Sequence, residues 1–179
     1  WIEHARVRML ARHPKQVIEP PYSTRSHTLR LYPCACRTIR TRVGEGIIEV
    51  RYPMELRYEA AEVQDAIRKG IEQAWRTEAQ ADLPQRTARL AGQLGFRCGA
   101  VTVRNARTRW GSCSARDDIS LSIHLMKLPD ELIDYVIIHE LCHTIHKNHG
   151  PKFHKLLDRL TGGHHLELRQ RLKTYSTRW

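Results

Sequence analysis

The sequence predicts an α+β fold with a small antiparallel sheet in front, supporting helices, and one buried helix rich in histidine. Three patterns lead to this prediction. Residues 27–58 alternate between apolar and polar side chains, apolar side chains recur at intervals of nearly four in residues 59–95, and residues 133–142 form a long apolar run. Alternation is typical of half-buried strands, and recurrence at three to four residues is typical of helices. At 179 residues, the chain is long enough for one well-filled domain.

The first segment, residues 1–26, differs in character from the rest. It predicts a short amphipathic helix followed by the connector "QVIEPPYSTRS", which is punctuated by proline and serine. Because the chain begins with Trp1 rather than methionine, we expect this segment to be truncated. We therefore divide the chain into residues 1–26, an N-terminal helical segment and connector, and residues 27–179, the main domain.

The next elements are short strands. The runs "TLRLY", "RTIRTRV" and "IIEVRYP" alternate in polarity, and Gly44-Glu45-Gly46 separates the second from the third. Together they predict the strands of an antiparallel meander.

A helical pattern begins near Glu59. Its apolar face consists of Val63, Ile67, Ile71 and Trp75. Pro84 closes this helix or opens the next at a first-turn position, and "QRTARLAGQL" continues helically to Gly95. We interpret the apolar face as core.

Two further β-rich runs flank a turn-rich centre. They cover Val101–Asn105 and Ile119–Ile123 and predict an extended hairpin. Pro129 then begins a helix, with Asp130 and Glu131 favourably placed near its positive N-terminal end. The apolar run "IDYVIIHELC" predicts that this helix is largely buried.

The cysteines and the hydropathy of the sequence indicate in which cellular compartment the protein is expected. No apolar run approaches the roughly 20 residues that span a bilayer, and there is no charged-then-apolar leader. An odd number of cysteines at irregular spacing argues against a disulfide framework and suits a reducing compartment. These cysteines are Cys34, Cys36, Cys98, Cys113 and Cys142. We expect a cytoplasmic protein without a membrane partner.

The net charge of +11 is concentrated at the two ends of the chain. Residues 1–58 carry 11 Lys and Arg against 5 Asp and Glu (+6), residues 59–140 carry 11 against 12 (−1), and residues 141–179 carry 8 against 2 (+6). Basic flanks attract polyanions, so nucleic acid is a possible partner. A solvated basic surface explains the same charge, since no nucleic-acid-binding motif accompanies it.

The chemistry is concentrated in "YVIIHELCHTIHKNHGPKFH", Tyr135 to His154, which holds five histidines and one glutamate. On a helix, His139 and His143 project from nearly the same face, one turn apart. Glu140 can lean over the open side of a metal held by these two residues, where its carboxylate can take a proton from a metal-activated water. This HExxH pattern on a helix is the signature of zinc peptidases, so Zn²⁺ is the predicted cofactor.

A third ligand must come from a reversal of the chain. His146 lies on the same face as His139 but about 10 Å along the axis, too far for one ion with bonds of about 2.0–2.1 Å. Asn148 can adopt a left-handed helix cap, Gly150 is flexible, and Pro151 can open a new helix. The predicted ligands are therefore His139, His143 and His149, with His154 in the following helix as the next candidate.

These residues also carry a family resemblance. "RWGSCS", "ISLSIHL" and "PDELIDYVIIHELCHTIHKNHGPKFH" resemble the YgjP-like metallopeptidase domain, a compact zincin that is also similar to the SprT-like proteases. The resemblance extends from about Ser26 to the end and implies a zinc-dependent peptidase acting on peptides or proteins. It implies His139, His143 and His149 as ligands beside Glu140. The chain departs from the family at His154, where tryptophan is common.

Alternatives remain open at this point. The SprT-like resemblance allows a DNA-associated protease that acts on DNA-bound proteins, and a non-catalytic zinc-binding domain is a third possibility. Arg109 and Trp110 either line the substrate channel or, for the tryptophan, anchor the core. The oxyanion donor is open among Arg109, His146 and His154. The oligomeric state is also undetermined.

Four other residues are not expected to take part in the chemistry. We interpret His124 and Cys142 as structural. We expect His164 and His165 to face the solvent.

Overall fold

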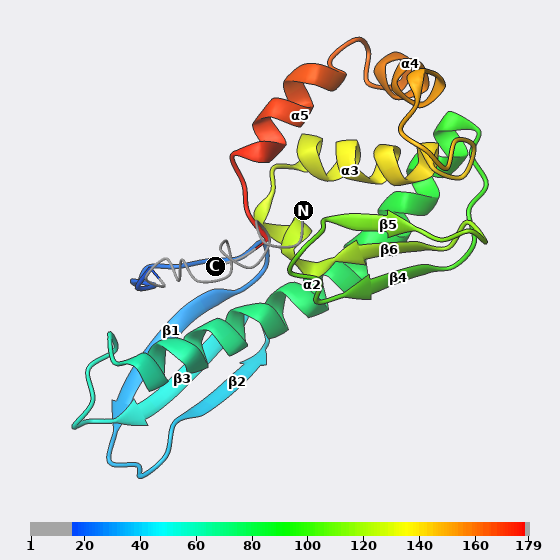
Figure 1. Ribbon diagram of the computed structural model, residues 1–179. Helices are drawn as coiled ribbons and strands as arrows, with labels where there is room; N and C mark the ends of the chain where they lie inside the picture. The colour runs from blue at the N-terminus through cyan, green and yellow to red at the C-terminus, as the bar shows by residue number, and fades with distance from the viewer. Residues whose placement is uncertain (1–15, 178–179) are drawn as a thin grey trace, which may run out of the picture.

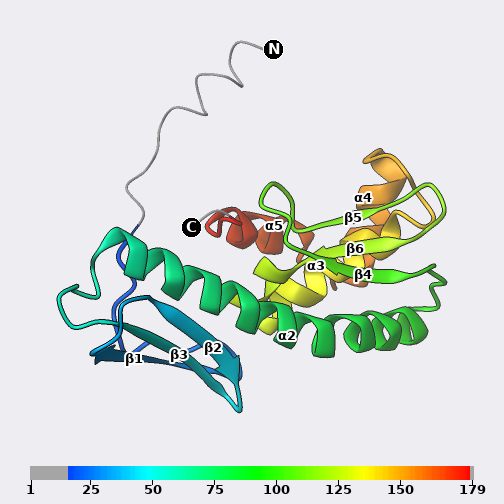
Figure 2. The same ribbon diagram turned by 90° about the horizontal axis from the view of Figure 1, so that it is seen from below.

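One long helix, α2 (Ala61–Leu94), packs against both sheets of the described part of the chain, one at each half of its length (Figures 1 and 2). The computed structural model describes residues 16–177. The apolar face predicted for α2 is buried, and its members Val63, Ile67, Ile71 and Trp75 are at most 1% exposed. The helix continues through Pro84 without interruption, so the predicted break there is wrong. Leu83 and Thr87 on either side are fully buried, and their packing offsets the backbone hydrogen bond that proline cannot donate.

The first sheet comprises β1 (Thr28–Cys34), β2 (Arg40–Gly44) and β3 (Ile47–Pro53), in the order β1-β3-β2. Strands β2 and β3 form the predicted antiparallel hairpin, whose turn uses positive φ at Glu45 and Gly46. Strand β1 instead pairs with β3 in parallel. The sheet is therefore mixed, and the predicted antiparallel meander is wrong for β1.

The order of these strands follows from burial. Strand β3 turns Ile48, Val50 and Tyr52 towards the core, where all three are buried. The central strand of a sheet is covered most completely, so the most apolar strand takes that place. Alternation in the sequence identifies strands and their faces, but it does not give their order.

The second sheet comprises β4 (Val101–Arg104), β5 (Gly111–Cys113) and β6 (Ile119–Ser122), in the order β4-β6-β5. The two predicted strands are present, but β4 and β6 pair in parallel, so the predicted hairpin between them is wrong. The turn-rich centre contributes β5, which pairs antiparallel with β6. A strand of three residues is too short for alternation to reveal.

The remaining helices follow the second sheet along the chain. They are the 3-10 helix η1 (Ile123–Lys127), α3 (Asp130–Cys142), α4 (Pro151–Leu160) and α5 (His165–Lys173). Helix α3 begins after Pro129, as predicted, and is buried along most of its length. Figure 1 shows α3 between the second sheet and the pair α4 and α5. These helices with two small sheets confirm the predicted α+β class.

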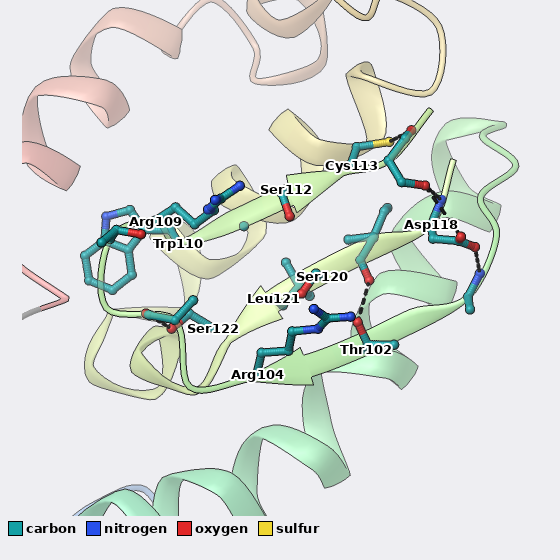
Figure 3. Close-up of a pocket in the computed structure, with 16 residues that line it drawn as sticks. Thr102, Arg104, Arg109, Trp110, Ser112, Cys113, Asp118, Ser120, Leu121 and Ser122 are labelled. Carbon is teal, nitrogen blue, oxygen red and sulfur yellow. Dashed lines mark hydrogen bonds between the residues drawn. The ribbon is translucent and has the colours of Figure 1, made fainter. Parts of the chain in front are cut away.

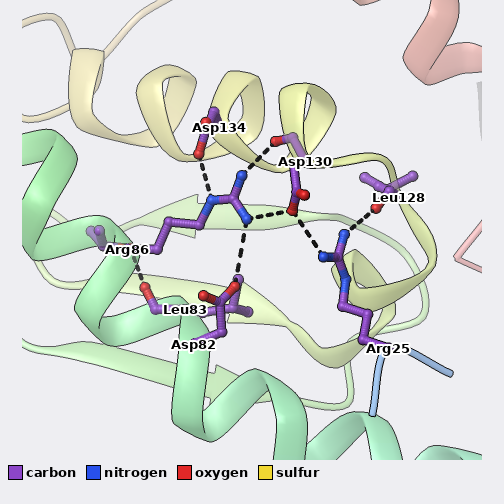
Figure 4. Close-up of polar contacts among 8 residues, drawn as sticks. Arg25, Asp82, Leu83, Arg86, Leu128, Asp130 and Asp134 are labelled. Atoms are coloured by element: carbon purple, nitrogen blue, oxygen red, sulfur yellow. Dashed lines mark hydrogen bonds and ion pairs between the residues drawn. The ribbon is translucent and has the colours of Figure 1, made fainter.

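A cluster of ion pairs fixes the start of α3 against α2 (Figure 4). The buried guanidinium of Arg86 donates to the carboxylates of Asp130 and Asp134 and to the Asp130 carbonyl oxygen, and it lies 3.6 Å from Asp82. Arg25 donates to the same Asp130 carboxylate at 2.8 Å. The N-terminal half of the helix that carries the histidines is thereby anchored.

The predicted N-terminal helix lies largely outside the described residues, which begin at Gln16. Residues 16–26 contain no helix. They are tied to α2 through Gln64, which binds the main chain of Ile18, and through Glu78, which accepts hydrogen bonds from Thr24 and Ser26. The division of the chain after residue 26 stays a prediction.

Two observations bear on the predicted location. Among the described helices, none has the length and apolarity needed to cross a membrane. A disulfide joins Cys34 and Cys36, which the cysteine spacing did not predict, while Cys98, Cys113 and Cys142 are free.

Candidate active site

Three imidazoles converge where α3 ends. His139 comes from the last turn of α3, His143 is the residue that caps this helix, and His149 comes from the loop before α4. The Nε2 atom of His149 lies 3.0 Å from Nε2 of His139 and 3.1 Å from Nε2 of His143. Donors held tetrahedrally about 2.0–2.1 Å from one zinc ion are about 3.3 Å apart. The spacing of the three nitrogens therefore fits a single metal ion.

A main-chain contact orients His143 for this role. Its Nδ1 lies 3.0 Å from the carbonyl oxygen of His146. Since a carbonyl only accepts hydrogen bonds, Nδ1 carries the proton and Nε2 keeps its lone pair. His146 thus contributes its backbone, and its side chain is not part of the histidine cluster.

The chain reverses without a left-handed residue. Among the described residues, the non-glycine positions with positive φ are Glu45 and Asp117, so the left-handed cap expected at Asn148 is wrong. The N–H of Gly150 instead donates to the Asn148 carbonyl at 2.8 Å, forming a tight turn. Gly150 is extended, and Pro151 opens α4 in the first turn, as predicted.

Phe153 forms the floor of the histidine cluster, and the sequence did not predict that it belongs to the site. It is fully buried, and its ring centroid lies 4.9, 4.6 and 4.8 Å from those of His139, His143 and His149. Contact with all three rings restricts how far each imidazole can rotate. An apolar residue two positions after a proline gives no signal of such a role in a single sequence.

The cluster favours neutral imidazoles. Burial, followed by the neighbouring histidines, lowers the pKa of His139 to about 3. Burial likewise lowers the pKa of His149. Neutral imidazole is the form that binds a metal ion, so the site does not need to release protons from these two groups before binding at neutral pH.

Glu140 lies beside the cluster in a tight contact with β5. Its side chain is buried, and burial raises its pKa to about 7, opposed by the positive charge of Arg109. A Cβ atom at Gly111 would lie 2.8 Å from both Cγ and Oε1 of Glu140, so only glycine allows this approach. Gly111 belongs to the "RWGSCS" stretch, and the sequence alone gives no sign that this glycine contacts Glu140.

A cavity of about 310 Å³ opens beside Glu140. It is lined by Gly111, Ser112, Cys113, His139, Glu140, His143, Lys147 and His149. A larger hollow of about 640 Å³ lies on the second sheet and shares the three β5 residues with this cavity. Figure 3 shows Arg109 and Trp110 at one end of the hollow and Cys113 at the other. Arg109 and Trp110 therefore line this hollow rather than the histidine cavity, and Trp110 also packs against the core.

Other residues considered from the sequence have mainly structural surroundings. Burial raises the pKa of Cys142 to about 12, so its thiol is not a nucleophile at neutral pH. His124 is buried, as expected for a structural residue, but it lies in η1 rather than in a strand. His164 is exposed as expected, whereas His165 is buried, and its Nδ1 lies 3.1 Å from the Tyr135 hydroxyl.

Comparison with protein families matches residues 1–175 to the YgjP-like family, described as "YgjP-like, metallopeptidase domain". The chain belongs to the YgjP-like metallopeptidase family. This confirms the resemblance drawn from the sequence and indicates a metallopeptidase that acts on peptides or proteins. No curated protein gives a significant match.

Two solved structures are similar to this YgjP-like chain. The metallopeptidase zymogen jannalysin of Methanocaldococcus jannaschii is 21% identical, with a TM-score of 0.46 over 52% of this chain and 95% of its own. The metallopeptidase zymogen abylysin of Pyrococcus abyssi is 23% identical, with a TM-score of 0.46 over 51% of this chain and 92% of its own.

Proposed function

We propose that the chain is a zinc-dependent metallopeptidase of the HExxH type, with His139, His143 and His149 as ligands and Glu140 as general base. The observation that supports this most directly is the convergence of three Nε2 atoms beside a buried carboxylate. Three imidazoles suit zinc or a closely related divalent metal. Zinc bound there supplies Lewis acidity to a scissile carbonyl and to a water molecule.

Glu140 performs the proton transfers in this proposal. Its carboxylate accepts a proton from the attacking water and later delivers it to the leaving amine. In the metal-free protein, burial raises the pKa of this carboxyl to about 7, and the positive charge of a bound zinc ion would lower it, so the ionised form that accepts the proton is present near neutral pH. No hydrogen bond from the described residues occupies this carboxylate, so it remains available to water.

Strand β5 is suited to hold the substrate. It is an edge strand of the second sheet, it contacts α3, and its residues Gly111–Cys113 line the cavity beside Glu140. An extended peptide can add to the free edge through main-chain hydrogen bonds, which would set its register relative to the histidines.

A DNA-associated protease is the second candidate, favoured by the outer face of the first sheet. Arg30, Arg40, Arg42 and Arg51 are exposed there, and the strand register places them as neighbours around Glu49. Such a face would bind a phosphate backbone with a steep salt dependence. Retention of duplex DNA at low salt that is lost when these arginines are replaced by glutamine would support it; no retention at low salt would remove it.

Replacement of Glu140 tests the proposed catalysis against a non-catalytic zinc-binding domain. In Glu140→Gln, zinc content should stay as in the wild type while cleavage of a peptide library falls by roughly 10²–10⁴-fold. Proteolysis that is unchanged in the variant would refute the role of Glu140. A wild-type protein that binds zinc but cleaves no peptide would favour the non-catalytic alternative.

A further inference from the structure

A second cavity of about 310 Å³ lies on the α5 side of the histidine cluster. Its lining residues are Tyr135, His139, His149, His154, His165 and Arg169. Helices α3, α4 and α5 and the loop before α4 all contribute to it. His139 and His149 line this cavity as well as the one beside Glu140, so the two cavities meet at the histidine cluster.

The lining contains one cation, Arg169, and further hydrogen-bonding side chains, but no carboxylate. Arg169 forms no ion pair or hydrogen bond with any described residue, so its guanidinium is available to a ligand. Burial, with contributions from nearby charges including Arg169, lowers the pKa values of His149 and His165. The negative charge of Asp158 opposes this shift by raising the pKa of His165, but Asp158 does not line the cavity.

Two histidines add further donors next to Arg169. His165 is 5% exposed, and its Nδ1 is paired with the Tyr135 hydroxyl, which leaves Nε2 for a ligand. The ring of His154 lies 5.4 Å from that of His165, and its nitrogens have no hydrogen-bond partner among the described residues. Three nitrogen-bearing side chains from α4 and α5 thus face one small cavity.

This donor set does not resemble a second metal site. The described part of the chain brings one group of potential ligands close enough for a metal ion, namely His139, His143 and His149. An unpaired guanidinium repels a cation, whereas it binds a carboxylate through charge-assisted hydrogen bonds. The ligand class that fits the cavity is therefore an anion.

We propose that this cavity is a substrate subsite that binds a carboxylate through Arg169, assisted by His154 and His165. The inference rests on the proposed peptidase function, because it names the substrate class of that site. A volume of about 310 Å³ is at the low end for ligand pockets and suits one side chain or one chain end. The carboxylate belongs either to an acidic residue beside the scissile bond or to a free C-terminus.

Peptide kinetics test the proposal. A cleaved peptide is varied at each position flanking the scissile bond among Glu, Gln and Lys, and separately between a free and an amidated C-terminus. We expect one of these carboxylates to raise kcat/KM by roughly tenfold over its neutral counterpart, and Arg169→Gln to abolish that preference. The control Arg159→Gln removes an exposed arginine of α4 outside the cavity and should keep it. An equal preference in wild type and Arg169→Gln would overturn the proposal.

A binding measurement separates this inference from the peptidase proposal. The zinc-loaded protein is titrated with N-acetylglutamyl amide, N-acetylglutaminyl amide and N-acetylalanine, and the imidazole NMR signals of His154 and His165 are followed. A shift with one of the two carboxylates, absent for the glutaminyl compound and lost in Arg169→Gln, supports the subsite even if no peptide is cleaved. Signals that respond equally to all three compounds, or that respond unchanged in Arg169→Gln, would refute it. Unfolding midpoints confirm that both arginine variants fold.

Discussion

The backbone of Gly111 lies directly against the carboxylate side chain of Glu140. A methyl group in place of the glycine hydrogen would be 2.8 Å from Oε1, closer than carbon and oxygen atoms approach. This contact couples the edge strand β5 to the candidate general base, so the strand that would hold the substrate also positions the proton acceptor.

Gly111→Ala should displace the Glu140 carboxylate while leaving the fold intact, since the backbone at Gly111 does not need positive φ. A displacement of about 1 Å lowers kcat/KM by roughly 10²-fold. Zinc content should remain that of the wild type. The control is Gly92→Ala on α2, where an added Cβ meets nothing within 4 Å. Wild-type kinetics in Gly111→Ala would show that the contact does not matter.

Phe153→Leu should weaken zinc binding. Leucine fills much of the space but gives the three imidazoles no flat floor, so the rings gain freedom that binding must then remove. We expect an affinity loss of roughly tenfold in a competition assay with a chromophoric chelator. Phe96→Leu, another buried phenylalanine but outside the cluster, controls for general loss of stability. Equal zinc affinities for the two variants would contradict this role for Phe153.

Arg86→Met should destabilise the fold through α3. The substitution keeps the aliphatic stem but leaves Asp130 and Asp134 without their buried partner. Because both carboxylates are partly exposed and regain water, the expected loss is about 2 kcal/mol in the free energy of unfolding from urea titrations. Arg89→Met, an exposed arginine on the same helix, should change it by less than about 0.5 kcal/mol. Similar losses in both variants would argue against a specific role of the Arg86 cluster.

The stability of the metal-free protein should fall between about pH 6.5 and pH 4, in part because of His124. Burial lowers its pKa to about 4, so the folded state holds it neutral while the unfolded chain binds a proton below its ordinary value of 6.5. Above pH 6.5 His124 does not lower the free energy of unfolding. As the pH falls towards 4, protonation of this residue in the unfolded chain lowers that free energy by roughly 3 kcal/mol at most.

Urea unfolding at pH 7 and pH 4.5, with a chelator present, measures this linkage. His124→Gln removes the titrating group, and its stability should change less between the two pH values than that of the wild type. The difference between the two proteins isolates His124 from the histidines of the cluster. Identical changes in both proteins would show that His124 does not contribute.

The sequence was most informative where chemistry and periodicity coincide. The helical period placed α2, Pro129 and the apolar run after it placed α3, and the spacing of His139 and His143 on one helix face required only helical geometry. The reversal at Gly150-Pro151 was also predictable, because proline both ends one helix and opens another. The position of His149 followed from that reversal.

Long-range packing could not be predicted in the same way. The parallel pairing of β1 with β3 and of β4 with β6 depends on which strand is most deeply covered, and one sequence does not contain this information. Pro84 within α2 shows tertiary packing overriding a local signal. Gly111 and Phe153 gained their roles only through contacts with residues distant along the chain.

Metal analysis of the purified protein beside two histidine variants tests the central claim most directly. His149→Ala removes the Nε2 atom that lies 3.0 and 3.1 Å from the other two nitrogens, whereas His146→Ala keeps the main-chain carbonyl that orients His143. We predict about one zinc per chain in the wild type and in His146→Ala, and loss of zinc in His149→Ala. Full zinc content in His149→Ala, or none in the wild type after growth with zinc, would contradict the proposed three-histidine site.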